Sequence, residues 1–422
     1  MMNRTCLPNI PERSRSWIAL ALGVVLSACS TSPPSSSDTA APSQPVPALP
    51  FDEAVLKAAN DLFTKAQSSS TDSALSAKPT LVIDPLIDGV TGNQTTATLT
   101  MQSRIEQLAR DKYPQFNVQP FTAANVEKSP IVLIGTFTPI NQEGKTEGLR
   151  EAYRVCLALA DLQSGKIVAK GFARAQIDGV DATPTPYFRD SPAWIKDPAT
   201  EGYIKTCQGT KAGDPINPVY ATRIKTAALI SEAISAYDNG RYQEALDRYM
   251  TVLSMPGGEQ LRTYNGVYLA NWKLNRREAA TQSFGQLVDY GLANKQLAMQ
   301  FLFKSGSTAF LPNTQITNAY PLWLKQIATR TANSNACLEI TGHTSPSGPE
   351  PMNERLSLRR AEYIQQRLES QAPALKKRTI ATGRGSREAL VGTGKDDITD
   401  ALDRRVRFNV IDCSIPDAKT KS

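Results

Sequence analysis

Hydrophobic and polar positions change between helical and strand-like spacing over the first half of the chain. Apolar residues recurring every three or four positions predict helices, and short runs rich in β-branched residues predict strands. The predicted elements are helices at 51–66 and 98–113 and strands at 80–87, 130–137, 154–161 and 166–173. Strand–helix–strand followed by a hairpin predicts an α/β sandwich with one mixed sheet over residues 51–220. The proline-rich end of this region, residues 183–218, is predicted to be an irregular loop.

Residues 222–298 show helical spacing throughout and contain an internal repeat with a period of 35 residues. Gly240, Ala245 and Tyr249 of the first copy correspond to Asn275, Ala280 and Phe284 of the second. A small residue and an aromatic residue four positions apart suit the close packing of a helical hairpin. The period resembles that of tetratricopeptide repeats, which implies a groove for a protein partner. The alternative is a helical spacer.

The last part of the chain, residues 299–413, alternates strands with helices. The predicted elements are strands at 300–304, 337–341 and 404–411 and helices at 313–330 and 353–368. Their order is βαβαβ, and a polar tail follows at 414–422. The whole chain is therefore predicted to be an α+β multidomain protein with an α/β sandwich, a central helical unit and a C-terminal βαβαβ domain.

The first thirty residues predict export. Arg4, Arg13 and Arg15 precede a short apolar run that is too short to span a bilayer, so residues 1–28 are predicted to be a signal peptide. The motif Leu26-Ser27-Ala28-Cys29 resembles the lipobox of bacterial lipoproteins, which implies that Cys29 is acylated. Ser30 follows Cys29, and the resemblance then favours the outer membrane over the inner membrane. Residues 29–50 are rich in Ser and Pro and are predicted to be a flexible tether.

Export changes the interpretation of the remaining cysteines. Disulfides form in an oxidising periplasm, and no CxxC spacing suggests a metal or redox site. Because two cysteines lie in the middle of the chain and two near its end, we predict the bridges Cys156–Cys207 and Cys337–Cys413. Two buried free thiols are the alternative for each pair.

Composition argues against an enzyme. The 422 residues contain a single histidine, and no nucleophile elbow, HExxH or GxGxxG motif is present. Val391-Gly392-Thr393-Gly394-Lys395 is not a phosphate loop, because Asp396 occupies the Ser/Thr position and the first glycine is missing. Asp84 and Asp88 are interpreted as turn residues rather than paired catalytic carboxylates. We expect no metal and no cofactor.

The C-terminal motifs resemble a known family. Ile340-Thr341-Gly342-His343-Thr344, then Asn353, Leu356, Ser357, Arg360 and Ala361, then Gly383 and Gly385, then Asp403-Arg404-Arg405-Val406 occur in the order found in OmpA-like domains. The resemblance implies non-covalent binding of the diaminopimelate residue in the peptidoglycan stem peptide. A second, looser resemblance relates residues 51–220 to the periplasmic α/β domain of the LpoB and CsgG-like lipoproteins.

The resemblance implies a set of ligand-binding residues, namely Arg360, Asn353, Ser345, Thr344 and Arg404. Arg360 lies on or beside the apolar stripe of its helix, where a charge needs a partner. A ligand carboxylate suits its guanidinium group. The alternatives are a snorkelling arginine, whose charged end reaches solvent, and an internal ion pair with Glu350 or Asp403. The family has Asp at the position of Ser345, so the usual partner of the ligand ammonium is missing. We interpret His343 as a residue that fixes this loop by hydrogen bonding.

These patterns predict a non-enzymatic lipoprotein of the outer membrane that faces the periplasm and binds peptidoglycan through its C-terminal domain. The middle domains would contact an unidentified periplasmic protein. Residues 301–413 carry 16 Lys and Arg against 11 Asp and Glu, which suits an anionic wall peptide, and the signal peptide argues against nucleic acid. The alternative is an envelope assembly or wall-synthase regulatory factor whose OmpA-like domain no longer binds peptidoglycan.

Overall fold

The computed structural model describes residues 47–69, 78–193, 196–297, 299–312, 317–392, 394, 396 and 399–413. All of them belong to one compact unit, Pro45–Ser422. The predicted signal peptide, Cys29, most of the tether and the tail 414–422 lie outside the described residues.

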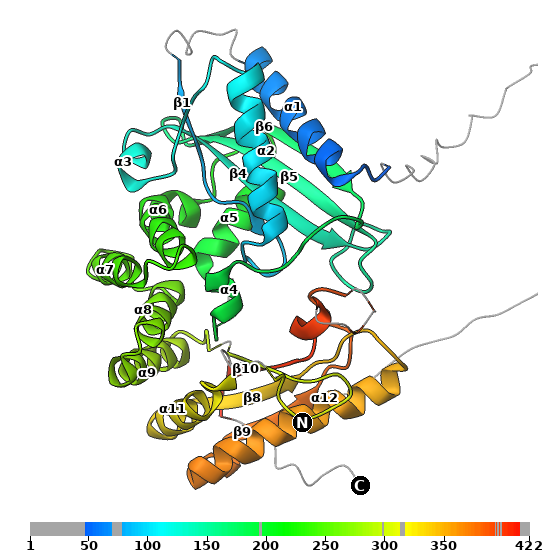
Figure 1. Ribbon diagram of the computed structural model, residues 1–422, viewed down its shortest axis with the longest axis vertical. Helices are drawn as coiled ribbons and strands as arrows, with labels where there is room; N and C mark the ends of the chain where they lie inside the picture. Colours follow the sequence, from blue (N-terminus) through cyan, green and yellow to red (C-terminus); the bar gives the residue numbers. More distant parts are fainter. Residues whose placement is uncertain are drawn as a thin grey trace, which may run out of the picture. The chain divides into compact units, whose positions relative to one another are not determined.

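A mixed sheet forms the N-terminal part of this unit (Figure 1). The strand order is β3-β1-β4-β5-β6, and β2 pairs with β4 beside this path. β1 is parallel to β3 and β4, whereas β4, β5 and β6 are antiparallel neighbours. The bounds are β1 Thr80–Ile83, β2 Ile87–Asp88, β3 Asn117–Gln119, β4 Ile131–Ile140, β5 Ala152–Asp161 and β6 Lys166–Ala175. The prediction of a mixed sheet is confirmed, although the predicted strand 80–87 is broken into two.

Helices cover both faces of this sheet. α1 (Phe51–Ser69) and α2 (Thr96–Lys112) share one apolar core with the sheet, and Figure 1 shows the two helices side by side. α1 packs on β5 and β6. α5 (Pro198–Gln208) and α6 (Pro218–Asp238) close a second core on the opposite face. A short helix, α3 (Ala123–Val126), packs near α6. The sheet is buried on both sides, which explains the nearly continuous burial of β4 and β5.

The proline-rich region is helical, which corrects the prediction of an irregular loop. It contains α4 (Pro186–Asp190), α5 and the start of α6. Each of these helices has its proline in the first turn, where the missing N–H is not needed. The Asp197 side chain caps α5 by accepting from the Thr200 N–H at 2.8 Å. Pro186, Pro198 and Pro218 therefore mark helix starts.

Each of the central helices packs against the next one along the chain. They are α6, α7 (Tyr242–Leu253), α8 (Leu261–Lys273) and α9 (Arg277–Ala293). The turns after α6 and α8 use residues with positive φ at equivalent positions, Gly240 (76°) and Asn275 (59°). The small and aromatic residues of both copies are fully buried. The 35-residue similarity thus has a structural counterpart, and the resemblance to tetratricopeptide repeats stays a prediction.

The C-terminal part contains a second sheet with the strand order β7-β10-β8-β9. β7 and β8 are antiparallel to β10, and β9 is parallel to β8. The bounds are β7 Gln300–Leu302, α11 Tyr320–Asn333, β8 Cys337–Gly342, α12 Glu350–Gln371, β9 Thr379–Gly383 and β10 Arg405–Ile411, with short 3-10 helices η1 Pro373–Lys377 and η2 Thr399–Leu402. β9 was not predicted: it is short and mostly half-buried, so its hydrophobic pattern is weak.

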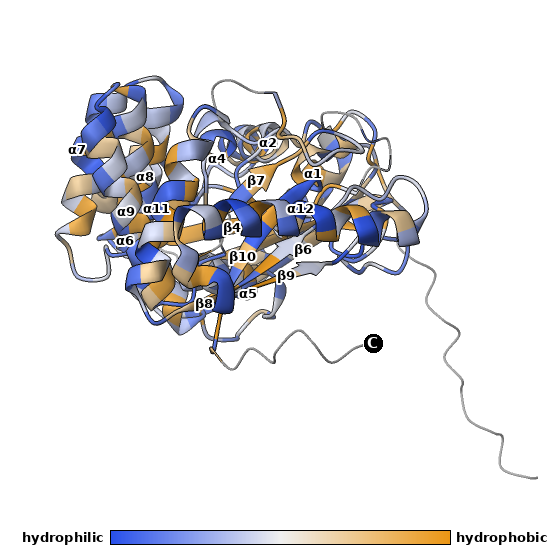
Figure 2. Ribbon diagram, turned by 90° about the horizontal axis from the view of Figure 1, so that it is seen from below, coloured by the Kyte–Doolittle hydropathy of each residue, from blue (hydrophilic) through white to orange (hydrophobic). Residues whose placement is uncertain are grey.

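α12 lies very close to the end of β8. A side chain at Gly342 would place its Cβ 1.8 Å from the carbonyl oxygen of Ser357, so only glycine fits there. Figure 2 shows that α12 carries many hydrophilic residues along its length. Its buried stripe ends in Ile364 and Leu368 on the C-terminal side, whereas its first half buries polar residues.

One hydrophobic core joins the central helices to the C-terminal part. Trp323 of α11 is 2% exposed and stacks on Phe284 of α9 at a centroid distance of 5.8 Å. Its indole Nε1 donates to the hydroxyl of Tyr268 in α8 at 2.7 Å. The two predicted domains therefore depend on each other for burial of this tryptophan.

The cysteines follow only half of the predicted pairing. Cys337 and Cys413 form a disulfide, as predicted. Cys156 and Cys207 are buried free thiols, so the predicted second bridge is wrong for this structure. Each thiol instead donates to the backbone carbonyl of the other cysteine, at 2.8 and 3.1 Å. These contacts satisfy both groups without a covalent bond.

Candidate ligand pocket

A pocket of about 360 Å³ lies where β7 and β8 end and α12 begins. It brings together all five residues that the sequence proposed as ligand-binding, which come from three separate segments of the chain. Among its lining residues are Thr344, Ser345, Asn353, Arg360 and Arg404. Their common location is a structural fact, and their role in binding stays a prediction.

Arg360 forms the floor of the pocket and is fully buried. Its guanidinium donates to three backbone carbonyls, those of Lys304, Ser307 and His343, each at 2.9 Å. The group also lies 5.3 Å from the centre of the Phe303 ring. Burial, with Arg404 nearby, lowers the pKa of Arg360 to about 10. Three of its five N–H groups therefore hold the two loops that form the pocket.

Neither carboxylate that the sequence offered as an internal partner of Arg360 contacts it. Glu350 accepts from the backbone N–H of Ser386. Asp403 accepts from the backbone N–H groups of Leu390, Val391 and Gly392. The internal ion pair is therefore wrong, because backbone carbonyls satisfy Arg360 instead.

A carboxylate that the sequence did not propose as a ligand lies in the pocket wall. Asp396 Oδ1 accepts from the Ser345 hydroxyl at 2.5 Å and from Arg404 Nη1 at 2.9 Å. Its Oδ2 accepts from the hydroxyl of Ser305. Burial tends to raise the pKa of Asp396, but the two hydroxyl donors and the charge of Arg404 lower it overall. Asp396 is therefore ionised at neutral pH.

The other loop residues shape the pocket. Asn353 donates through Nδ2 to the carbonyls of Ser347 at 3.1 Å and Gly348 at 3.4 Å. The Thr344 backbone N–H donates to Gly385 at 2.9 Å. Within the described part of the chain, the buried Thr344 hydroxyl has no hydrogen-bond partner. A buried hydroxyl in a pocket wall without a protein partner is suited to a ligand or a water molecule.

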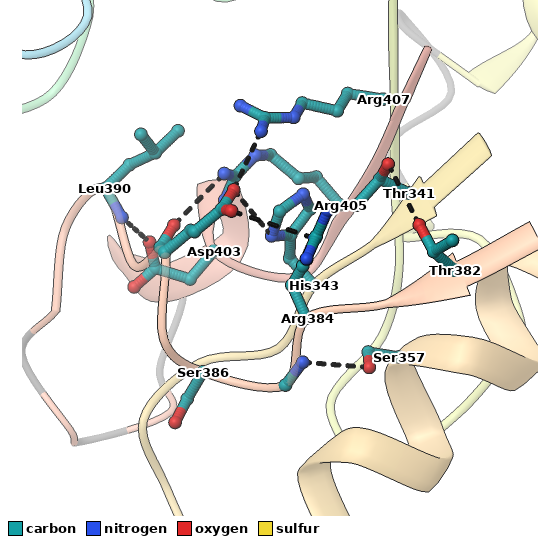
Figure 3. A network of polar contacts seen from close by, with 12 residues as sticks. Thr341, His343, Ser357, Thr382, Arg384, Ser386, Leu390, Asp403, Arg405 and Arg407 are labelled. Atoms are coloured by element: carbon teal, nitrogen blue, oxygen red, sulfur yellow. Dashed lines mark hydrogen bonds and ion pairs between the residues drawn. The ribbon is translucent and has the colours of Figure 1, made fainter. Parts of the chain in front are cut away.

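His343 fixes the loop through its backbone rather than its ring. Its N–H donates to Arg405 at 2.8 Å, and its carbonyl accepts from Arg360. Figure 3 shows the imidazole among Arg384, Arg405 and Arg407. Burial and these positive charges lower the pKa of His343 well below its usual value. The ring makes no hydrogen bond to any described residue, and its Nδ1 lies 3.7 Å from Glu388 Oε2, so the hydrogen bonds by which His343 fixes the loop come from its backbone.

The charges around the pocket define what it can hold. Four arginines line it, and Asp396 is the only carboxylate among the described lining residues. Arg360 and Arg404 are buried, whereas Arg355 and Arg359 are exposed at the rim. Such a site suits a group that carries negative charge together with one positive centre. In the ranges that the structure covers, no cluster of His, Cys, Asp and Glu could hold a metal ion.

The family comparison agrees with the C-terminal motifs. Residues 302–400 match the model of the OmpA family. The end of the chain therefore contains an OmpA-like domain. A comparison with curated proteins found no match for the chain.

Solved structures similar to this chain cover about a quarter of it. The peptidoglycan-associated lipoprotein from Burkholderia pseudomallei is 21% identical, and the match covers 26% of this chain and 89% of that chain with a TM-score of 0.23. An outer membrane protein from Borrelia burgdorferi B31 is 22% identical, with coverages of 27% and 87% and a TM-score of 0.21. The cell wall anchor of the T6SS from Pseudomonas aeruginosa is 26% identical, with coverages of 26% and 75% and a TM-score of 0.21.

Sequence reasoning missed Asp396 as a pocket residue. In the sequence, Asp396 was considered only because it occupies the Ser/Thr position of a phosphate-loop motif and so excludes that motif. It lies 51 positions after Ser345. The only available signal was an acidic residue shortly before the Asp403-Arg404 motif. No spacing rule links such a residue to the loop after β8.

None of the helices in the described ranges is both long enough and apolar enough to cross a bilayer.

Proposed function

We propose that this protein binds peptidoglycan non-covalently through its C-terminal OmpA-like domain. The observation that carries the proposal is the pocket at the start of α12, where the residues of the family motif converge. OmpA-like domains bind peptidoglycan, and residues 302–400 match this family. The arginine-rich wall suits the carboxylates of a stem peptide.

Co-sedimentation with purified diaminopimelate-type sacculi tests this proposal. We would use the chain from Ser30 onward, because the core that joins α8, α9 and α11 argues against a shorter fragment. The wild-type chain should sediment with the sacculi. Ser347→Trp should abolish sedimentation, since an indole at this half-buried lining residue fills the pocket.

Ser370→Trp is the matched control for that variant. Ser370 is exposed near the other end of α12, so the same substitution there leaves the pocket open. The control should bind sacculi like the wild type. A wild-type chain that stays in the supernatant would rule out the wall-binding function.

We further propose that acylated Cys29 anchors the protein in the outer membrane, with its folded part in the periplasm. The support is the lipobox-like motif and the Ser/Pro-rich segment after it. A Cys29→Ser variant should move from the membrane fraction to the soluble periplasmic fraction. Wild type and variant in the same fraction would contradict the anchor.

The alternative is an assembly or wall-synthase regulatory factor that has lost wall binding. It rests on Ser345, which stands where the family has Asp. The sedimentation experiment separates the two functions, because only the first predicts binding of the wild-type chain. In both cases the α/β and helical parts are proposed to contact a periplasmic protein.

A further inference from the structure

The pocket contains the carboxylate of Asp396, whereas the family motif places its Asp at position 345. Ser345 brings no charge, but its hydroxyl donates to Asp396 at 2.5 Å. Asp396 also contacts Arg404 and Ser305, so it bridges the loop after β8, the start of β10 and the segment after β7. Its side chain remains 23% exposed. A ligand in the pocket can therefore reach it.

We propose that Asp396 binds the ammonium group of the ligand and so replaces the missing carboxylate at position 345. This inference rests on the proposed wall-binding function and specifies its ligand chemistry. The ligand group is an amino acid centre with a free amine and a carboxylate. The amine pairs with Asp396, and the carboxylate faces the arginines of the wall.

The backbone around Asp396 is held in a defined conformation. Its N–H donates to Asp400 Oδ2 at 3.0 Å. Its φ is 55°, in the left-handed region that Asp and Asn tolerate better than most residues. Asp403 accepts three N–H groups at the start of the same segment, including Leu390 (Figure 3). These contacts position a carboxylate that would otherwise lie in an unsupported loop.

The hydrogen bonds of Asp396 leave room for one more donor. Oδ1 accepts from Ser345 and Arg404, and Oδ2 accepts from Ser305. An ionised carboxylate has about four lone-pair sites, so the donors among the described residues leave one site for an ammonium N–H. The lowered pKa of Asp396 keeps it ionised at neutral pH, where an amine is protonated.

Binding to sacculi before and after N-acetylation of their free amines tests the proposal. Acetylation removes the positive charge and leaves the carboxylates in place. The wild-type chain should bind acetylated sacculi about tenfold more weakly than untreated ones, since a charge-assisted contact is lost. Asp396→Asn should bind both kinds equally and weakly. Asn keeps the shape of the side chain and tolerates the positive φ, so the variant is expected to fold.

Two further variants test whether the effect depends on a carboxylate in the pocket. Asp396→Asn combined with Ser345→Asp should regain the preference for free amines, because it returns a carboxylate to the same pocket wall. Asp412→Asn, which removes an exposed charge of this domain outside the pocket, should behave like the wild type.

The outcomes separate the two proposals. If the wild-type chain binds both kinds of sacculi equally, or if Asp396→Asn keeps the preference for free amines, the role of Asp396 is wrong while wall binding stands. If the wild-type chain binds neither, wall binding and the role of Asp396 both fail. A preference for free amines that depends on Asp396 supports both.

Discussion

Arg360 shapes the pocket mainly through hydrogen bonds to the backbone. Its guanidinium connects α12 to the loop after β7 and to the loop after β8 through three carbonyls. Those two loops supply Ser305 and Ser345, which contact Asp396. The arginine therefore positions the pocket wall, and a direct ligand contact would use only its two remaining N–H groups.

Replacing Arg360 tests this structural role. Arg360→Lys should lower the free energy of unfolding by at least about 2 kcal/mol, because a single ammonium cannot reach three separated carbonyls in the plane of the guanidinium. Arg359→Lys is the control, since Arg359 is the exposed neighbour on the same helix. Urea unfolding would measure both variants. Equal stability of Arg360→Lys and the wild type would contradict the role of Arg360 as a loop anchor.

At the same scale, the sequence was informative about which residues gather and poor about their partners. The family motif named five residues that the structure places in one pocket. It did not reveal Asp396, since contact with Ser345 depends on how a segment 51 positions away folds. The positions of the cysteines in the sequence also did not show that Cys156 and Cys207 remain thiols, because proximity in the fold does not determine whether a bond forms.

At the scale of elements, one half of α12 packs in the hydrophobic core and the other half lines the pocket. Its buried stripe is apolar at Ala361, Ile364 and Leu368 and polar at Asn353, Ser357 and Arg360. The change in polarity marks the half of the helix that faces the pocket, and the sequence pattern contained it. Prolines misled the sequence reasoning for α4 and α5, because a proline in the first turn starts a helix as readily as it breaks one.

The packing of α11 on the central helices leads to a prediction at the same scale. Tyr268→Phe removes the acceptor of the buried Trp323 indole N–H and should destabilise the protein by about 1–3 kcal/mol. Tyr264→Phe is the control, because its hydroxyl donates to Glu259 at an exposed position. Thermal unfolding would measure the difference. Equal effects of the two substitutions would argue against this contact as a stabilising link between the parts.

At the scale of the whole molecule, a buried acid connects the N-terminal sheet to the helical layer. Asp84 follows β1 and accepts from the hydroxyl of Tyr220 in α6 at 2.7 Å. Burial raises the pKa of Asp84 to about 7. The folded protein therefore keeps this proton between about pH 4 and pH 7, where the unfolded chain releases it. The stabilising effect of the proton is complete below about pH 4 and disappears as the pH rises through about 7.

Asp84→Asn removes this titration. The stability of the wild type relative to the variant should fall by up to about 1.4 kcal/mol per pH unit between pH 4.5 and 7. Urea unfolding at several pH values measures this slope. Asp111→Asn, at an exposed position of α2, should leave the slope unchanged. Parallel stability curves for Asp84→Asn and the wild type would show that Asp84 does not titrate in this window.

The order of elements over the whole molecule could be predicted largely from periodicity, including the mixed sheet and the alternating C-terminal part. The short strands β3 and β9 could not, because a few half-buried residues give little periodic signal. The shared core between the central helices and α11 was also missed. It arises from contacts between segments that the sequence divides into separate repeats and domains.

The Cys337–Cys413 disulfide has a mechanical consequence. The two cysteines are 76 positions apart, and all the pocket residues from Thr344 to Arg404 lie between them. Because the bond closes a covalent ring around these segments, pulling on the chain before Cys337 cannot draw the pocket residues from Thr344 to Arg404 apart beyond the length of that ring.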